Sequence, residues 1–347
     1  MADISKIDKN LKVESGIDKP DIDFFSGEDE RFKLYGVFKE NGMYRRMPEA
    51  VAKSVSDGVY GLHTNTAGGR VRFYTDSAYI VVSAVMSEVC KMPHMAFTGA
   101  IGFDVYVGDR YVKSIIPPAD VEDKFEGVVE FETDEFRDIT INFPLYSNVK
   151  DVYIGLQKCA EVKEPSKYSN DKPIVYYGSS ITQGGCASRP GTCYQGIISR
   201  RFNRDYINLG FSGSARAEDE MIEYIKNLDM SMFVYDYDHN APNVEHLKAT
   251  HEKMFKAVRE RHPEIPIIIM SRPKYYLTDD EQKRLEVIKQ TYNNAVSGGD
   301  KAVYLLNGSE LTVLCLNEGT VDDCHPTDFG FASMAKALGD LIEKEGL

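Results

Sequence analysis

Short apolar runs alternate with polar turns over residues 31–160, and the runs have the length and composition of β-strands. They are rich in β-branched and aromatic residues, and Gly, Asp or Pro separates them. The predicted strands cover 71–77, 79–86, 102–116, 127–133 and 138–145, with a hairpin connection at 107–111. Only residues 42–55 predict a helix in this half. The pattern therefore predicts a β-sandwich or jelly roll.

The period changes after residues 160–173, a polar segment with two prolines that we interpret as a linker. Apolar runs now alternate with amphipathic helical stretches, and the first run, Ile-Val-Tyr-Tyr-Gly, carries no charge. Predicted strands are 174–178, 206–211, 232–238, 266–271 and 302–308, and predicted helices are 192–202, 217–228, 243–262, 279–296 and 329–346. This order predicts a parallel five-stranded sheet in a three-layer α/β/α domain. We divide the chain into domains at 1–160 and 161–347.

The formal net charge of −13 disfavours a nucleic-acid partner and an anionic membrane surface, because both attract clustered Lys and Arg. The N-terminal residues show no signal-peptide pattern, and nowhere do 18 apolar residues run together, so a cytoplasmic protein is expected. Six cysteines are too few for a disulfide framework, although a Cys186–Cys193 pair stays open. Without CxxC spacing no metal is expected, and no cofactor.

Polar residues follow the predicted strands at the edge where open α/β sheets place ligands. Gly178, Ser179 and Ser180 follow the first strand, and a serine here is a nucleophile, a helix cap or part of a turn. The groups after the later strands are Ser212 and Gly213, then Asp236, Asp238, His239 and Asn240, then Ser271 and Arg272, and finally Asp322, Asp323 and His325. Because these groups all follow strands at the same edge of the sheet, together they indicate an active site more strongly than any one of them does alone.

Acyl transfer from an ester requires a nucleophile, a base, a group that orients the base and donors for the oxyanion. His325 is a suitable base, because imidazole changes its protonation near neutral pH. Asp322, three residues earlier in the same loop, is placed to accept from the ring N–H. Asp323 is the alternative, but a carboxylate so close in sequence tends to point the other way.

The segments GSSITQG (178–184), NLGFSG (208–213), DYDHNAP (236–242) and DDCH (322–325) resemble, in that order, the four blocks of the SGNH (GDSL-like) hydrolases. The resemblance covers about 175 residues and implies a flavodoxin-like α/β/α domain. It implies Ser180 as nucleophile, with His325 and Asp322 completing the triad. The implied oxyanion donors are the N–H groups of Ser180 and Gly213 and the side-chain amide of Asn240.

Two positions depart from the family pattern. Ser179 stands where the family usually has Asp, and His239 stands where a Gly precedes the oxyanion Asn. The second departure leaves His239 as a rival donor, with Asn240 then capping the next helix ahead of Pro242.

The first half resembles the β-rich N-terminal domain of a group of bacterial carbohydrate acetylesterases. That domain's Gly-x-Asp-Leu-Tyr signature appears as Gly102-Phe-Asp104-Val-Tyr106, in which we expect Asp104 and Tyr106 to be structural. The resemblance implies a serine esterase that removes O-acetyl groups from mannan- or xylan-derived oligosaccharides. A lipolytic or thioester hydrolase, an acyltransferase and a carbohydrate-binding protein without turnover are the alternatives. The sugar, the hydroxyl position and the oligomeric state stay open.

Overall fold

The computed structural model describes residues 17 and 19–347. They form two compact units, and neither unit is one continuous segment. The first contains the chain up to Arg45, Thr64–Lys167 and Ser188–Gly191, and the second contains Arg46–His63, Tyr168–Ala187 and Thr192–Leu347. The predicted domain division between residues 160 and 161 stays a prediction. Residues 1–16 and 18 of the first predicted domain lie outside the described residues.

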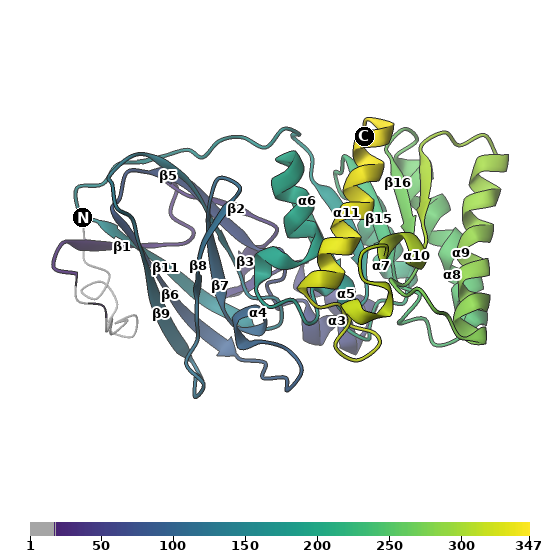
Figure 1. Cartoon of the computed structure of the whole chain (residues 1–347), viewed down its shortest axis with the longest axis horizontal. Coiled ribbons are helices and arrows are strands. Elements are labelled where there is room, and N and C mark those ends of the chain that lie inside the picture. The colour runs from purple at the N-terminus through teal and green to yellow at the C-terminus, as the bar shows by residue number, and fades with distance from the viewer. Residues whose placement is uncertain (1–16, 18) are drawn as a thin grey trace. The chain divides into compact units, whose positions relative to one another are not determined.

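The first unit is built from antiparallel sheets, as predicted. Its strands are β1 (Ile22–Ser26), β2 (Lys33–Tyr35), β3 (Phe38–Glu40), β4 (Met43–Arg45), β5 (Arg70–Thr75), β6 (Tyr79–Glu88), β7 (Phe103–Val107), β8 (Arg110–Ile115), β9 (Lys124–Glu130), β10 (Arg137–Asn142), β11 (Asn148–Gln157) and β12 (Val162–Lys163), with a short helix α4 (Phe97–Ala100). One sheet has the order β1-β11-β6-β9, and the other has the order β12-β5-β10-β7-β8 with β2 paired to β5 (Figure 1). Between the sheets, aromatic rings such as Phe103 and Phe125 pack together in the core.

The helix predicted over residues 42–55 is partly wrong. Residues Met43–Arg45 form strand β4, which pairs with β3, and helix α2 (Glu49–Val55) begins only after Pro48. Proline is favoured at a helix start because it has no N–H to leave unsatisfied there. Helix α2 and the following α3 (Asp57–Leu62) bury Ala52, Val55 and Val59 in the core of the second unit.

The second unit contains the predicted parallel sheet, with the strand order β14-β13-β15-β16-β17. The strands are β13 (Ile174–Gly178), β14 (Tyr206–Gly210), β15 (Met232–Asp236), β16 (Ile267–Met270) and β17 (Val303–Leu306); the helices are α5 (Ser180–Gln183), α6 (Tyr194–Phe202), α7 (Asp219–Lys226), α8 (Val244–Arg261), α9 (Asp279–Ser297), α10 (Gly308–Leu311) and α11 (Asp328–Glu345), with 3₁₀ turns η2 (Pro190–Thr192) and η3 (Leu316–Gly319). This is the predicted flavodoxin-like α/β/α class. None of the described helices is long and apolar enough to cross a membrane.

Strand β13 shows why the central sheet reads as uninterrupted apolar sequence. Tyr176 packs against Tyr194 of α6 on one face, and α6 in turn stacks against Phe331 of α11. Tyr177 points to the opposite face, into the cluster formed with α7, α8 and α9. Because helices cover both faces of the sheet (Figure 1), the residues that point to either face of β13 are all buried. Polar chemistry is therefore confined to the strand ends.

Candidate active site

The turn from β13 into α5 positions Ser180. A Cβ on Gly178 would lie 2.2 Å from the backbone O of Asp236, so only glycine lets these two strand ends approach so closely. Ser179 then caps α5, because its side chain accepts a hydrogen bond of 3.2 Å from the N–H of Ile181. Ser180, the next residue, is the first of the helix, and its hydroxyl lies at the carboxyl edge of the sheet.

Ser180, His325 and Asp322 are brought together as the sequence predicts. The Ser180 Oγ lies 2.8 Å from the Nε2 of His325, and the His325 Nδ1 lies 2.8 Å from the Oδ2 of Asp322. An ionised carboxylate can only accept, so the ring proton resides on Nδ1 and Nε2 is left to accept from the serine hydroxyl. This is the arrangement in which a histidine activates a serine.

Asp322 is fixed by a local turn of its own loop. Its Oδ1 accepts from the backbone N–H of His325 at 2.8 Å and from that of Cys324 at 3.2 Å. Burial alone raises the pKa of the Asp322 carboxyl, but these N–H groups and the imidazole outweigh burial and hold the pKa below its usual range. Asp322 therefore remains ionised while it orients His325.

Asp323, the alternative carboxylate, points elsewhere. It adopts a left-handed backbone conformation with φ of 64°. Its Oδ2 accepts from the Nζ of Lys274 at 2.6 Å, and its Oδ1 lies 3.4 Å from the Nδ2 of Asn317. The geometry therefore assigns the orienting position to Asp322.

Asn240 lies in the loop after β15, with its amide held in one orientation. Its Oδ1 accepts from the N–H of Ala215 at 3.2 Å, and a backbone N–H can only donate, so the Nδ2 must face the other way. The alternative that Asn240 caps the next helix is wrong, because Asn243 caps α8 by accepting from the N–H of His246 at 2.8 Å.

Gly213 supplies the other predicted amide from the loop after β14. It has φ of 68°, which glycine adopts without strain. Within residues 17 and 19–347, no hydrogen bond from its N–H to a protein acceptor is found. The Ser180 N–H, the third predicted donor, belongs to the first turn of α5.

Gln183 is a residue that sequence reasoning missed. Its Oε1 accepts from the N–H of Ser212 at 3.0 Å, immediately before Gly213. The backbone O of its neighbour Thr182 accepts from Gln195 and from Asn208, each at 2.7 Å. These contacts tie α5 to α6, to β14 and to the loop after β14. The signal in the sequence was limited to the polar pair Thr182 and Gln183 close behind Ser180.

His239 and Cys324 face one another beside the triad. The His239 Nδ1 lies 3.6 Å from the Cys324 Sγ, and the His239 Nε2 is buried without a partner among residues 17 and 19–347. Burial lowers the pKa of His239 to about 4 and raises the pKa of the Cys324 thiol to about 11. Both groups are therefore neutral near pH 7. No disulfide joins any of the six cysteines, so Cys186 and Cys193 are thiols.

Asp236 ends strand β15 in full burial. The Thr182 hydroxyl donates to its Oδ2 at 3.3 Å, while Oδ1 has no partner among the described residues. Burial, and then the charge of Asp238, raise the pKa of Asp236 well above its ordinary value. The folded chain therefore holds this proton more tightly than the unfolded chain does.

This proton makes stability depend on pH. As pH rises above the unfolded value of about 4, the unfolded chain loses the proton and the folded chain keeps it, so the Asp236 contribution falls. We expect Asp236→Asn, which is neutral at every pH, to gain stability relative to the wild type as pH rises. Melting temperatures at pH 5, 6.5 and 8 test this, and a difference that does not grow with pH would contradict it.

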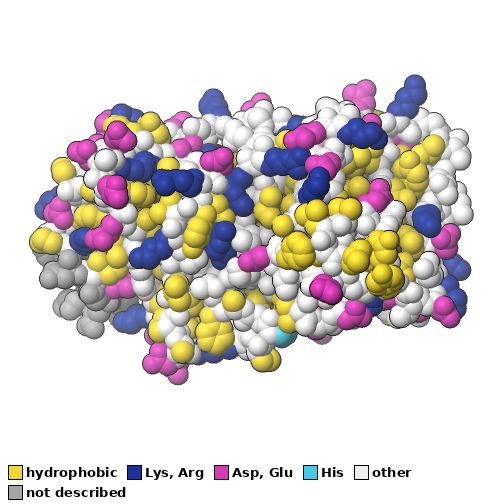
Figure 2. All heavy atoms as spheres, viewed as in Figure 1, with side chains coloured by type: hydrophobic (Ala, Val, Ile, Leu, Met, Phe, Trp, Pro, Cys, Tyr) yellow, Lys and Arg dark blue, Asp and Glu magenta, His cyan; other side chains and the backbone are white. Residues whose placement is uncertain are grey.

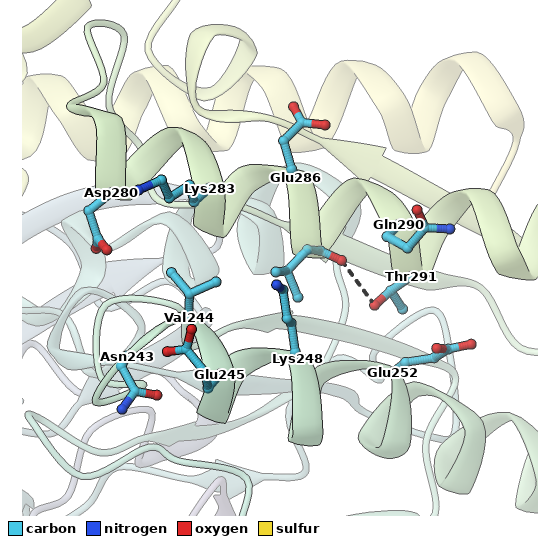
Figure 3. Close-up of a pocket in the computed structure, with 11 residues that line it drawn as sticks. Asn243, Val244, Glu245, Lys248, Glu252, Asp280, Lys283, Glu286, Gln290 and Thr291 are labelled. Carbon is cyan, nitrogen blue, oxygen red and sulfur yellow. Dashed lines mark hydrogen bonds between the residues drawn. The ribbon is translucent and has the colours of Figure 1, made fainter.

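A separate groove lies between α8 and α9 (Figure 3). Its volume is about 620 Å³, and it is lined by charged and polar side chains that include Lys248, Glu252, Lys283 and Glu286. None of the candidate catalytic residues lines it. The groove therefore adds nothing to the chemistry of Ser180.

Comparison with known proteins identifies the class of this chain. Residues 171–343 match the GDSL-like lipase/acylhydrolase family, and residues 22–162 match the GxDLY domain, the N-terminus of SGNH-hydrolase-type esterases. The chain therefore belongs to the GDSL-like lipase/acylhydrolase family and is an ester hydrolase, as the sequence predicts. No curated protein sequence matches it.

Solved structures share both parts of the fold. A Bacteroides ovatus protein assigned as a GDSL-like lipase is 26% identical with a TM-score of 0.82, and the match covers 93% of this chain and 97% of that one. The salicylyl-acyltransferase SsfX3 of a tetracycline biosynthetic pathway is 18% identical with a TM-score of 0.78, over 95% and 99%. The acetyl xylan esterase Est2A from Butyrivibrio proteoclasticus is 12% identical with a TM-score of 0.61, over 93% and 98%.

Proposed function

We propose that this protein is a serine esterase that removes O-acetyl groups from oligosaccharides, and that Ser180 carries the acyl group. The observation that supports the proposal most directly is the hydrogen-bonded chain from Ser180 through His325 to Asp322, with 2.8 Å at each step. In that chain the ionised Asp322 favours the imidazolium that forms when His325 takes the serine proton.

The reaction would proceed in two halves. The Ser180 Oγ attacks the acetyl carbonyl carbon while His325 accepts its proton, and the oxyanion faces the N–H groups of Ser180 and Gly213 and the Asn240 Nδ2. The ester C–O bond then breaks, and His325 returns the proton to the departing sugar oxygen, which leaves as a hydroxyl group. A water molecule then attacks the acyl-enzyme in the same way, with His325 again accepting the proton, and acetate is released.

The sugar part of the proposal is supported by an exposed aromatic pair in the same unit. Tyr275 and Tyr276 follow β16 at the carboxyl edge of the sheet, are 43% and 65% exposed and pack edge to face. Asn317 accepts from both backbone N–H groups and so links the pair to the chain segment that leads to His325. Tyrosine presents a flat apolar face with a polar tip, which suits the C–H face of a sugar ring.

Acetate release from acetylated mannan- and xylan-oligosaccharides, measured beside nitrophenyl acetate, butyrate and octanoate, tests the proposal. We expect kcat/KM to be highest for acetyl esters and acetate to be released from at least one oligosaccharide. Tyr276→Ala should raise KM for the oligosaccharide but not for nitrophenyl acetate, and Tyr60→Ala, an exposed tyrosine of α3, is the control. A preference for octanoate would instead assign a lipolytic enzyme, and acyl transfer to added alcohols faster than hydrolysis would assign a transferase.

A further inference from the structure

The loop that carries Asp322 and His325 is exposed, so apolar packing alone does not hold it. The side chains of His325 and Asp322 are 24% and 39% exposed, and the loop runs from η3 to α11. We propose that Lys274 is a positioning residue for this loop and that, through Asp323, it holds Asp322 and His325 in the geometry that activates Ser180. The inference rests on the triad proposed above, but not on the identity of the ester.

Lys274 is a firm anchor because it is itself held at the carboxyl edge of the sheet. Its side chain is only 13% exposed, and its Nζ lies 2.6 Å from the Asp323 Oδ2 and 3.3 Å from the Glu281 Oε1. The hydrogen bond to Asp323 raises the pKa of Lys274, although burial opposes it, so the ammonium group stays charged. A charged donor that is already oriented loses little freedom when it binds the loop.

Lys274 is the outer end of a series of ion pairs in which basic and acidic side chains alternate. The same Glu281 Oε1 accepts from the Arg272 Nη1 at 2.7 Å, and the Arg272 Nε donates to the buried Asp238 Oδ2 at 3.0 Å. Glu281 also closes the capping box of α9 with Thr278. The chain of contacts therefore connects the ends of β15 and β16 and the start of α9 to the loop of the triad.

On the loop side of the ion pair, Asp323 restrains the backbone of the loop that carries Asp322 and His325. Its left-handed conformation, with φ of 64°, turns its side chain away from that of Asp322, so neighbouring carboxylates serve different partners. Left-handed backbone is unfavourable for a residue with a side chain, least so for Asn and Asp. The ion pair with Lys274 favours this turn, and any relaxation of Asp323 would displace Asp322 directly.

Lys274→Met and Asp323→Asn disrupt the ion pair from opposite ends: the first removes the ammonium group, and the second removes the negative charge of its partner. Asn tolerates the left-handed conformation and keeps the shape of Asp, so only the charge is removed. We expect each variant to lower kcat for nitrophenyl acetate on the order of tenfold, short of the roughly 10²-fold that a 1 Å misplacement can cost. KM should stay within about twofold, because the ester contacts are unchanged. Lys274→Arg should restore most of kcat.

The matched control is Lys253→Met, which removes an exposed ion pair with Asp219 in the same unit and should leave kcat unchanged. The double variant Lys274→Met/Asp323→Asn should be no slower than the slower single variant, because both substitutions disrupt the same ion pair. Wild-type kcat in Asp323→Asn, losses that multiply in the double variant, or a fall in melting temperature without a fall in kcat would overturn the inference. Ser180→Ala tests the triad separately, since an active Ser180→Ala refutes the triad whatever Lys274 does.

Discussion

Ser180→Ala is expected to abolish ester hydrolysis, with a fall in kcat on the order of 10⁴ or more. The substitution removes the hydroxyl oxygen that lies 2.8 Å from the His325 Nε2, in position to form the acyl-enzyme. The helix should survive, because the side chain that caps α5 belongs to Ser179 and alanine is a good helix former. Initial rates with nitrophenyl acetate and a far-ultraviolet circular dichroism spectrum measure the two effects.

Ser179→Ala is the matched control. The Ser179 hydroxyl is buried and bonded to the Ile181 N–H, so it cannot reach an ester, and its removal should cost about 1 kcal/mol of stability while most of the activity remains. Mass spectrometry of the enzyme after a serine-directed phosphonate should place the adduct on Ser180. An adduct on Ser179 or on Ser212 would show that the nucleophile has been assigned wrongly.

The catalytic sheet was predictable because its strands are covered on both faces. Residues 174–178 were predicted to form a strand and do so without any shift, since burial on both faces leaves an apolar run closed by glycine. The rule that parallel strands end at one edge then sufficed to group Ser180 with His325. That rule concerns topology, and it needs no knowledge of side-chain contacts.

The antiparallel unit was harder, because its strands alternate or carry charges. Strand β9 begins at Lys124, three residues before the predicted start. The prediction rested on the apolar run that begins with the two valines, and it left out the buried Phe125. Strand β11 was not among the predicted strands; Lys150 and Asp151 interrupt its apolar pattern at a point where the register with β6 shifts. Local composition does not report such irregularities.

Other residues of the site act through contacts that no local pattern encodes. Gln183 reaches Ser212 and Lys274 reaches Asp323, which are 29 and 49 positions away in the sequence. From the sequence alone, a glutamine or a lysine in a polar segment is interpreted as a solvated surface residue, because its partner becomes a neighbour only in the folded chain. The proposed nucleophile and base are therefore visible in the sequence, whereas the groups that position their loops are not.

Asn240→Ala is expected to lower kcat by roughly 10²–10³, the usual cost of removing one oxyanion donor. The Asn240 Oδ1 is engaged by the Ala215 N–H, so the Nδ2 is the atom left to face a reacting carbonyl at the carboxyl edge of the sheet. An amide is a neutral donor at every working pH, whereas an ionised Asp238 in its place would repel the developing charge. The donor acts on charge that appears only in the transition state, so KM should change little.

His239→Ala is the comparison that decides this assignment. The His239 ring contacts Cys324 through Nδ1 and its Nε2 is buried, so neither nitrogen is open to the solvent from which an ester arrives. Steady-state kinetics of both variants on nitrophenyl acetate, with melting temperatures to confirm that each is folded, should show the larger loss of kcat in Asn240→Ala. Because Asn243 and not Asn240 caps α8, a loss of activity in Asn240→Ala cannot be attributed to a lost helix cap. If Asn240→Ala retains full kcat and His239→Ala loses it, the oxyanion donor is the side chain of His239.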